Sequence, residues 1–180
     1  MNLILIGYRG TGKSTVAQEL KRRLGLPVVS MDQEITRRAA KTVAQIVADC
    51  GWSEFRRLER DLAMELVDRK NLIIDAGGGI VTQDEAMRSL ARSGVVFWLW
   101  ASPNTIAERL ATESARPESS RPPLEGRSTL DEIETVLQQR LPLYREVAHY
   151  RVDTDNQTIE GCAREIERLF RHHGPESTNT

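Results

Sequence analysis

The chain has 180 residues, 25 of them basic and 26 acidic, so one domain with a sizeable core is expected, and no net charge attracts nucleic acid or an anionic membrane. Cys50 and Cys162 are far apart and lack metal-ligand spacing, which indicates a reducing compartment. No apolar stretch reaches membrane-spanning length, and the chain starts directly with a strand pattern, so a cytoplasmic protein is expected.

The first pattern along the chain is an apolar run at residues 3–6, followed by a glycine-rich segment at residues 7–15. This segment has the form G-x-x-x-x-G-K-[ST], in which successive backbone N–H groups surround phosphate oxygens at the start of a helix. Lys13 is expected to reach the β- and γ-phosphates of a nucleotide, and the Ser14 hydroxyl is expected to bind Mg²⁺. The sequence therefore predicts a nucleotide site formed by Gly10, Thr11, Gly12, Lys13, Ser14 and Thr15.

A second strand is expected at residues 26–29, and Asp32 follows its end. In open parallel α/β sheets the carboxyl ends of the strands face the ligand crevice, which is where a functional carboxylate would lie. Asp is also a favoured helix N-cap, and residues 33–40 have a helical pattern. Spacing leaves both interpretations of Asp32 open.

A short helix is expected at residues 43–50, ended by Gly51, and a longer helix is expected at residues 53–69. Arg56 and Glu59 lie three positions apart in the longer helix, so the carboxylate could hold the guanidinium in one pose. A solvated surface ion pair that contributes little is the alternative.

A third buried strand is expected at residues 71–75, and it ends in Asp75. A hydrophobic strand that ends in Asp resembles the Walker B element, whose carboxylate helps to hold Mg²⁺. A run of three glycines follows, which could bring a backbone N–H close to a ligand; a flexible turn is the alternative. These residues are Gly77, Gly78 and Gly79.

A helix at residues 83–92 and a strand at residues 95–100 come next. Trp98 and Trp100 alternate on that strand and are expected to pack rather than to stack on bases. Ser102 and Pro103 are the N-cap and first position of a further helix, which contains Arg109.

Residues 114–127 are rich in Ser, Pro, Glu and Arg and contain few apolar side chains. Beside a phosphate site, such a segment is a candidate lid that excludes water during group transfer, with a surface insertion as the alternative. Its candidate charge-stabilising groups are Arg116, Arg121 and Arg127.

Thr129 and Glu132 form a capping box for a long helix that should kink or restart at Pro142, near Arg140. The remaining elements are expected as a strand at residues 151–154, a helix at residues 158–170 and a flexible tail at residues 172–180. Because strands alternate with helices, we expect one α/β domain over residues 1–171, a three-layer sandwich whose parallel sheet has helices on both faces.

Together these motifs resemble those of the shikimate kinase family over residues 3–169. Beyond the phosphate loop, the resemblance rests on Asp32, Phe55-Arg56 with Glu59, Gly77-Gly78-Gly79, Arg121-Pro122-Pro123-Leu124 and Arg140-Leu141-Pro142-Leu143-Tyr144. It implies a P-loop kinase fold with a five-stranded parallel sheet in the order 2-3-1-4-5, as in nucleoside monophosphate kinases. It also implies that ATP and Mg²⁺ are used to phosphorylate the 3-hydroxyl of shikimate. A monomer without nucleic-acid or membrane partners is expected.

On the acceptor side, the resemblance implies that Asp32 holds the acceptor hydroxyl and takes its proton, within a binding region at about residues 31–60. Arg56 and Arg140 would bind the shikimate carboxylate, in keeping with the preference of guanidinium for planar anions. Gly78 would offer its backbone N–H to shikimate in a turn shaped by Gly77 and Gly79.

On the nucleotide side, the resemblance implies that Lys13 and Arg121 neutralise the transferring phosphoryl group. Arg109 and the segment from Asp153 would frame the adenine. Phosphoryl transfer needs little covalent participation by the protein, so positioning and charge stabilisation should supply most of the rate.

The chain departs from the family pattern at several positions. The family usually has Asp-x-Asp after the second strand, with the first Asp tied to the magnesium shell, and that position is Ser30 here. Ala76 precedes the glycines, Asp75 lies one step earlier, Pro123 stands where the lid usually has Leu, and Trp52 replaces a common acidic residue. We hypothesise that Asp75 replaces the missing carboxylate, since two strand ends beside one phosphate loop can reach one ion.

Two other functions stay open at this stage. A related small-molecule kinase of the gluconate type shares the phosphate loop and the lid, although Arg56, Arg140 and the triple glycine favour shikimate. The second possible function is a regulatory module that binds nucleotide but has lost catalysis. Ser30, in place of the usual Asp, is the main observation that supports it.

Overall fold

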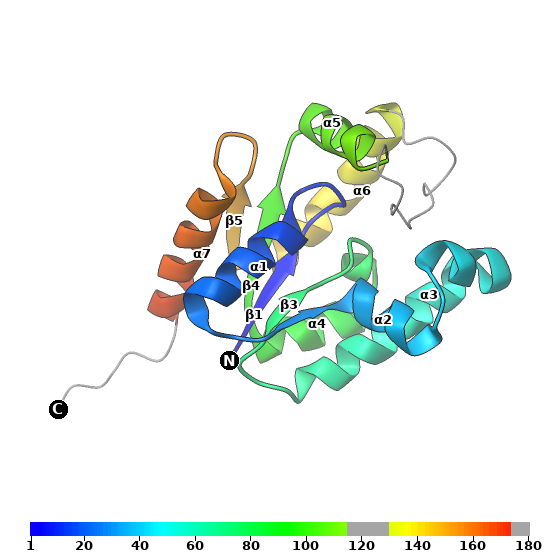
Figure 1. The fold of residues 1–180 in the computed structure, drawn as a ribbon, viewed down its shortest axis with the longest axis horizontal. Helices are drawn as coiled ribbons and strands as arrows, with labels where there is room; N and C mark the ends of the chain where they lie inside the picture. Colours follow the sequence, from blue (N-terminus) through cyan, green and yellow to red (C-terminus); the bar gives the residue numbers. More distant parts are fainter. Residues whose placement is uncertain (115–129, 174–180) are drawn as a thin grey trace.

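In the computed structural model, which describes residues 1–114 and 130–173, a parallel β-sheet lies between layers of helices (Figure 1). The strands are β1 (Asn2–Ile6), β2 (Val28–Ser30), β3 (Ile73–Asp75), β4 (Gly94–Trp100) and β5 (Tyr150–Asp153). Their order is β2-β3-β1-β4-β5, and every neighbouring pair is parallel. The expected five-stranded order is confirmed.

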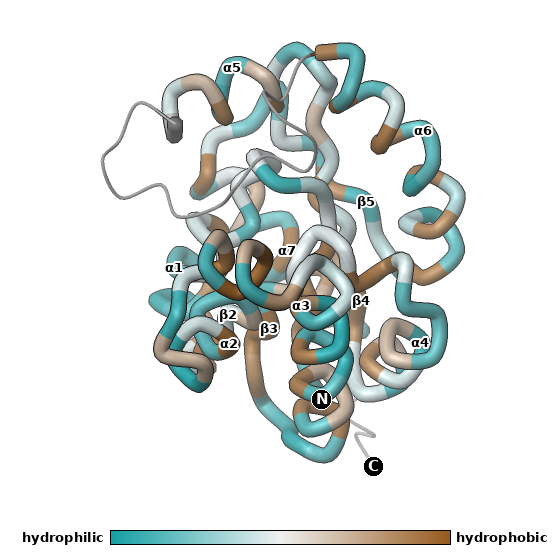
Figure 2. The backbone as a smooth tube through the Cα atoms, turned by 90° about the vertical axis from the view of Figure 1, so that its right-hand side faces the viewer, coloured by the Kyte–Doolittle hydropathy of each residue, from teal (hydrophilic) through white to brown (hydrophobic). Residues whose placement is uncertain are grey.

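Helices follow the strands in the alternating pattern of an α/β fold. They are α1 (Lys13–Leu24), α2 (Met31–Ala39), α3 (Val43–Val67), α4 (Asp84–Ser93), α5 (Pro103–Ser114), α6 (Leu130–Val147) and α7 (Ile159–His173), and a 3₁₀ turn, η1, covers Ile80–Thr82. In Figure 2, α6 alternates between hydrophilic and hydrophobic along its length, as expected of a helix with one face on a core.

Two hydrophobic cores lie on opposite faces of the sheet because successive strand side chains point in opposite directions. Leu3 and Leu5 of β1 pack in the core that includes side chains of α1 and α7. Ile4 and Ile6 pack in the other core, with side chains of α2, α3, α4 and α6. Burial on both faces explains why residues 3–6 of β1 are an unbroken apolar run, and it gives the expected three-layer arrangement.

The expected break at Gly51 is confirmed: α3 is interrupted by a kink there, where Gly51 has φ 80° and ψ 170°. Two other helices differ from expectation. Helix α6 continues through Pro142 instead of restarting, because Leu137 and Tyr144 on either side of it are buried. Helix α7 reaches His173, where the expected tail had already begun, and the His173 ring contacts two aromatic rings near β5.

Some expectations concern residues that the structure does not describe. The expected lid lies outside the described residues except for Ser114, so the structure assigns nothing to Arg116, Arg121 and Arg127. Thr129 and residues 174–180 also lie outside them. Of the helices in residues 1–114 and 130–173, none has both the length and the apolar character that crossing a bilayer requires.

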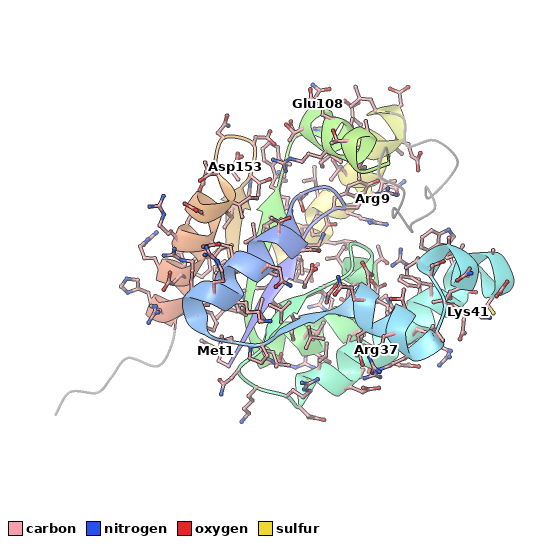
Figure 3. The ribbon with its side chains drawn as sticks, in the orientation of Figure 1. Met1, Arg9, Arg37, Lys41, Glu108 and Asp153 are labelled. Atoms are coloured by element: carbon pink, nitrogen blue, oxygen red, sulfur yellow. The ribbon has the colours of Figure 1, made fainter. Side chains whose placement is uncertain are left out.

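Parallel strands bring their carboxyl ends to one edge of the sheet, and the predicted functional residues gather there. In Figure 3, Met1 marks the opposite end, while Arg9 on the loop after β1 and Asp153 at the end of β5 lie towards this edge.

Candidate active site

The phosphate loop joins the end of β1 to the start of α1. Gly7 and Gly12, the two glycines of the motif, have φ of 145° and 85°, and Gly10 between them has φ 79°, so all three take positive φ values that favour glycine. Lys13 Nζ donates hydrogen bonds to the carbonyl oxygens of Gly7 and Tyr8, each at 3.0 Å. The loop therefore holds its lysine against its own backbone, at the positive end of the α1 dipole.

Ser14 and Asp75 meet at this edge, as expected of a metal site. Ser14 Oγ donates a hydrogen bond to Asp75 Oδ2 at 2.6 Å. Asp75 is paired in register with Leu5 of β1 on one side and with Ser30 of β2 on the other. The carboxylate hypothesised to replace one at position 30 thus stands on the neighbouring strand, directly beside that position.

The residues present fit a magnesium ion. Mg²⁺ prefers oxygen ligands and is usually held by one or two protein groups together with phosphates and water, and Ser14 and Asp75 supply two adjacent oxygen donors. Within the described ranges, no group of three or more His, Cys, Asp or Glu side chains could hold a metal by itself, so phosphate or water ligands would have to complete this site.

Asp32 is the second residue of α2 and is not its N-cap. Ser30 occupies the N-cap position, without a side-chain hydrogen bond, so the capping interpretation of Asp32 is wrong. A Cβ on Gly77 would lie 3.2 Å from Asp32 Oδ1, which places this carboxylate against the glycine turn. The location agrees with the functional interpretation.

The pair formed by Arg56 and Glu59 is not a solvated surface pair. Arg56 Nη1 donates to Glu59 Oε2 at 2.6 Å, and the Glu59 side chain has no exposed surface. Gln83 Nε2 donates to the same oxygen at 3.0 Å. The Arg56 guanidinium also lies 5.4 Å from the ring centre of Trp52, within the range of a cation–π contact. Arg56 is thus held in one pose, as the functional alternative requires.

The triple glycine makes room for these side chains. None of the three glycines has a positive φ, so a left-handed backbone conformation does not explain them. A Cβ on Gly77 would overlap the Glu59 carboxylate, and a Cβ on Gly79 would overlap the Arg56 guanidinium. A Cβ on Gly78 would lie 3.4 Å from the carbonyl oxygen of Gly7, so the turn also packs against the phosphate loop.

Arg140 reaches the same turn from α6. Its Nη1 donates to the carbonyl oxygen of Gly78 at 2.8 Å, and the Tyr144 hydroxyl donates to that oxygen at 3.3 Å. Burial raises the pKa of Tyr144 to about 12, so the phenol keeps the proton that it donates. Arg56 and Arg140 therefore lie against adjacent residues of one turn, although they come from helices far apart in the sequence.

Arg109 connects the phosphate loop to the segment after β5. Its guanidinium donates to the carbonyl oxygen of Gly10 at 3.3 Å, to Thr154 Oγ1 at 3.0 Å and to the Thr154 carbonyl oxygen at 2.7 Å. The structure thus brings together Arg109 and the segment from Asp153, the two groups expected to frame a base.

Most predicted site residues lie together, and sequence reasoning missed two that support them. Gln83 carried no signal, because it acts through a tertiary hydrogen bond that only the fold creates. Tyr8 was treated as a variable position of the loop motif, although it is buried. Of the predicted site residues, the three candidate lid arginines, Arg116, Arg121 and Arg127, lie outside the described ranges.

The comparisons with known proteins agree with this geometry. A family model for shikimate kinase matches residues 9–170. A shikimate kinase of Thermus thermophilus is 38% identical over 169 residues, which are 93% of this chain and 89% of the relative. A solved shikimate kinase of Acinetobacter baumannii, in complex with shikimate, is 31% identical with a TM-score of 0.87, over 97% of this chain and 95% of that one. A gluconokinase of Sinorhizobium meliloti, 18% identical with a TM-score of 0.55, over 95% of this chain and 94% of that one, shares the fold alone.

Proposed function

This chain belongs to the shikimate kinase family, and we propose that it transfers the γ-phosphoryl group of ATP to the 3-hydroxyl of shikimate, giving shikimate 3-phosphate and ADP. The observation that carries the proposal is the position of Arg56 and Arg140 against one glycine turn, which itself packs on the phosphate loop. The proposal is supported because two groups suited to a carboxylate lie next to a segment suited to phosphate.

In the proposed complex, Arg56 and Arg140 bind the acceptor carboxylate. Guanidinium presents its N–H groups in a planar fork that matches a carboxylate, and two such groups select an acid over a neutral polyol. Glu59 positions Arg56 from behind, and the backbone N–H of Gly78 is the remaining donor for the acceptor.

Asp32 is the proposed acceptor of the proton from the attacking hydroxyl. Its carboxylate lies beside Gly77, at the same turn as the two arginines. A carboxylate at hydrogen-bond distance orients the hydroxyl for in-line attack and takes its proton as the new phosphate ester bond forms.

The nucleotide is proposed to lie along the phosphate loop. Gly10, Thr11, Gly12, Ser14 and Thr15 would present backbone or hydroxyl donors to the phosphates, and Lys13 would neutralise the transferring group. Arg109 would border the base with Thr154. The roles of Arg121 and of a lid at residues 114–127 rest on the sequence resemblance and on composition.

We propose that Ser14 and Asp75 hold the magnesium that accompanies ATP, Ser14 directly and Asp75 through the hydration shell. Bound Mg²⁺ would neutralise charge that develops on the phosphate oxygens. Asp75 also fixes the Ser14 hydroxyl through their hydrogen bond.

The proposed role of Asp75 is tested by moving the carboxylate between neighbouring strands. Asp75→Asn should weaken magnesium-dependent ADP binding by about tenfold, the lower end of the range for losing a group that supports a bound metal. Calorimetry of ADP binding at a series of magnesium concentrations would measure this change. Adding Ser30→Asp to Asp75→Asn should restore binding, because the two positions are paired in register. An Asp75→Asn variant with unchanged magnesium dependence would rule the role out.

The activity itself is tested with a coupled assay of ADP release. The purified chain with ATP and Mg²⁺ should release ADP when shikimate is added and should form shikimate 3-phosphate. Preference for gluconate would indicate the related kinase activity, and nucleotide binding without turnover on either acid would indicate a regulatory module.

We also propose that the chain acts as a cytoplasmic monomer with a single catalytic domain over residues 1–171. Cys50 and Cys162 are free thiols, as is usual in reducing compartments. Light scattering of the purified chain would test the oligomeric state.

A further inference from the structure

Tyr8 belongs to the phosphate loop, yet its side chain points away from solvent and has 1% of its surface exposed. Its neighbours are apolar residues at the end of β4 and on α5 and α6, which form the third hydrophobic cluster of the molecule. The buried members besides Tyr8 are Ala101, Ile106, Leu110, Ile133 and Leu137. Tyr8 thus joins the phosphate loop to the helix that contains Arg140.

The Tyr8 ring contacts Arg140 itself. The Arg140 Cζ atom lies 5.8 Å from the ring centre, within the range of a cation–π contact. Burial raises the pKa of Tyr8, and the nearby Arg140 charge opposes that rise. Arg140 therefore rests on two supports, the Gly78 carbonyl oxygen and the face of the Tyr8 ring.

The backbone of Tyr8 is fixed from the nucleotide side. Its carbonyl oxygen accepts hydrogen bonds from Lys13 Nζ at 3.0 Å and from Thr11 Oγ1 at 2.8 Å. One residue thus has its carbonyl among the nucleotide-binding groups and its ring against an arginine assigned to the acceptor. A long arginine side chain loses considerable rotamer freedom when it is held in place, so a rigid, buried platform reduces the cost of ordering it on binding.

We propose that Tyr8 is a positioning residue for the acceptor: its ring sets the Arg140 guanidinium relative to the phosphate loop, so that the acceptor carboxylate and the transferring phosphoryl group are held in register. The inference rests on the proposed function, because it assigns Arg140 to the acceptor carboxylate. It predicts that replacing the ring lowers affinity for the carboxylate more than it changes the chemical step.

The test compares Tyr8→Leu, which removes the ring face, with Tyr8→Phe, which keeps it. Tyr8→Leu should raise the KM for shikimate about three- to tenfold, the range expected for a partly desolvated cation–π contact. The KM for ATP and kcat should change less than about twofold, because Lys13 and Thr11 bind the Tyr8 backbone rather than its side chain. Tyr8→Phe should retain the wild-type KM.

Shikimate methyl ester separates positioning from general damage to the fold. The ester lacks the charged carboxylate, so wild-type and Tyr8→Leu enzymes should use it with similar kcat/KM. Ile106→Val, a change in the same cluster, serves as the control: it should lower thermal stability slightly and leave the preference for shikimate over the ester unchanged.

If Tyr8→Leu does not fold, fluorinated phenylalanines at position 8 keep the ring size while weakening its negative face. The KM for shikimate should then rise with the number of fluorine atoms. If the wild-type enzyme prefers shikimate to its ester, and a Tyr8→Leu or fluorinated variant shows an equal preference, the inference about Tyr8 is wrong and the assignment of Arg140 stands. A wild-type enzyme without that preference overturns the assignment of Arg140 and the inference with it.

Discussion

Replacing Glu59 by glutamine should both destabilise the protein and weaken its acceptor site. The change keeps the size of the side chain and removes the charge that pairs with Arg56 at 2.6 Å. Breaking a fully buried pair costs about 3–5 kcal/mol, but a quarter of the Arg56 side chain is exposed, and glutamine can still accept a hydrogen bond from Gln83. We therefore expect a loss of about 2 kcal/mol in the free energy of unfolding.

The same helix provides a matched control. Glu54 and Arg57 have the same three-residue spacing and the same 2.6 Å separation, but their side chains are 34% and 49% exposed. Glu54→Gln should cost less than about 1 kcal/mol, since exposed pairs contribute little. Burial is the main difference between the two pairs; Glu54 also precedes its arginine in the sequence, and Arg57 has a second carboxylate partner, Asp61, at 2.6 Å.

Urea unfolding and initial-rate kinetics measure both effects of Glu59→Gln. A loosened Arg56 should raise the KM for shikimate about tenfold, which corresponds to about 1.4 kcal/mol, while the KM for ATP stays near the wild-type value. If Glu59→Gln and Glu54→Gln were equally stable and both kept the wild-type KM for shikimate, the account of a positioned Arg56 would be refuted.

Three further changes test other parts of the structure. Gly79→Ala should abolish shikimate binding measured by calorimetry while nucleotide binding persists, because its Cβ would displace the Arg56 guanidinium; retained shikimate affinity would contradict this. Arg109→Met should raise the KM for ATP about tenfold and leave that for shikimate unchanged, because it removes three hydrogen bonds beside the phosphate loop; an unchanged KM for ATP would exclude the base-framing role. Burial lowers the pKa of His149, whose Nδ1 accepts a hydrogen bond from the Val96 N–H. The neutral imidazole therefore contributes stability at pH values above the unfolded-state pKa of about 6.5. That contribution is lost as the pH falls through the lower folded-state pKa. Thermal unfolding should therefore show a smaller loss of Tm between pH 7.5 and about pH 5.5 in His149→Gln than in the wild type, and an equal loss would contradict the assignment.

Local patterns predicted the features that depend on local chemistry. The glycines of the phosphate loop take left-handed backbone angles that the motif requires, and the apolar run of β1 is buried on both faces of the sheet. The closeness of Ser14 and Asp75 followed from the rule that parallel strands end at one edge.

Features that depend on tertiary contacts could not be predicted in the same way. Arg56 with Glu59 and Glu54 with Arg57 are both acid–base pairs three residues apart in the sequence, but Glu59 is buried beside Gln83 and the glycine turn, whereas Glu54 is partly exposed. For the same reason, α6 was expected to kink or restart at Pro142, but it does not restart, because its neighbours Leu137 and Tyr144 are buried in the core. The three glycines were expected to bring a backbone N–H close to a ligand, and no sequence pattern indicated that Gly77 and Gly79 also leave space for side chains of α2 and α3.

A crystal structure of the chain with ADP, Mg²⁺ and shikimate is the most direct test of the central claim. The acceptor carboxylate should lie between Arg56 and Arg140, with oxygen-to-nitrogen distances of about 2.7–2.9 Å to both guanidinium groups. A carboxylate that lies away from these two arginines, or a shikimate ring that binds with a hydroxyl group between them, would contradict it.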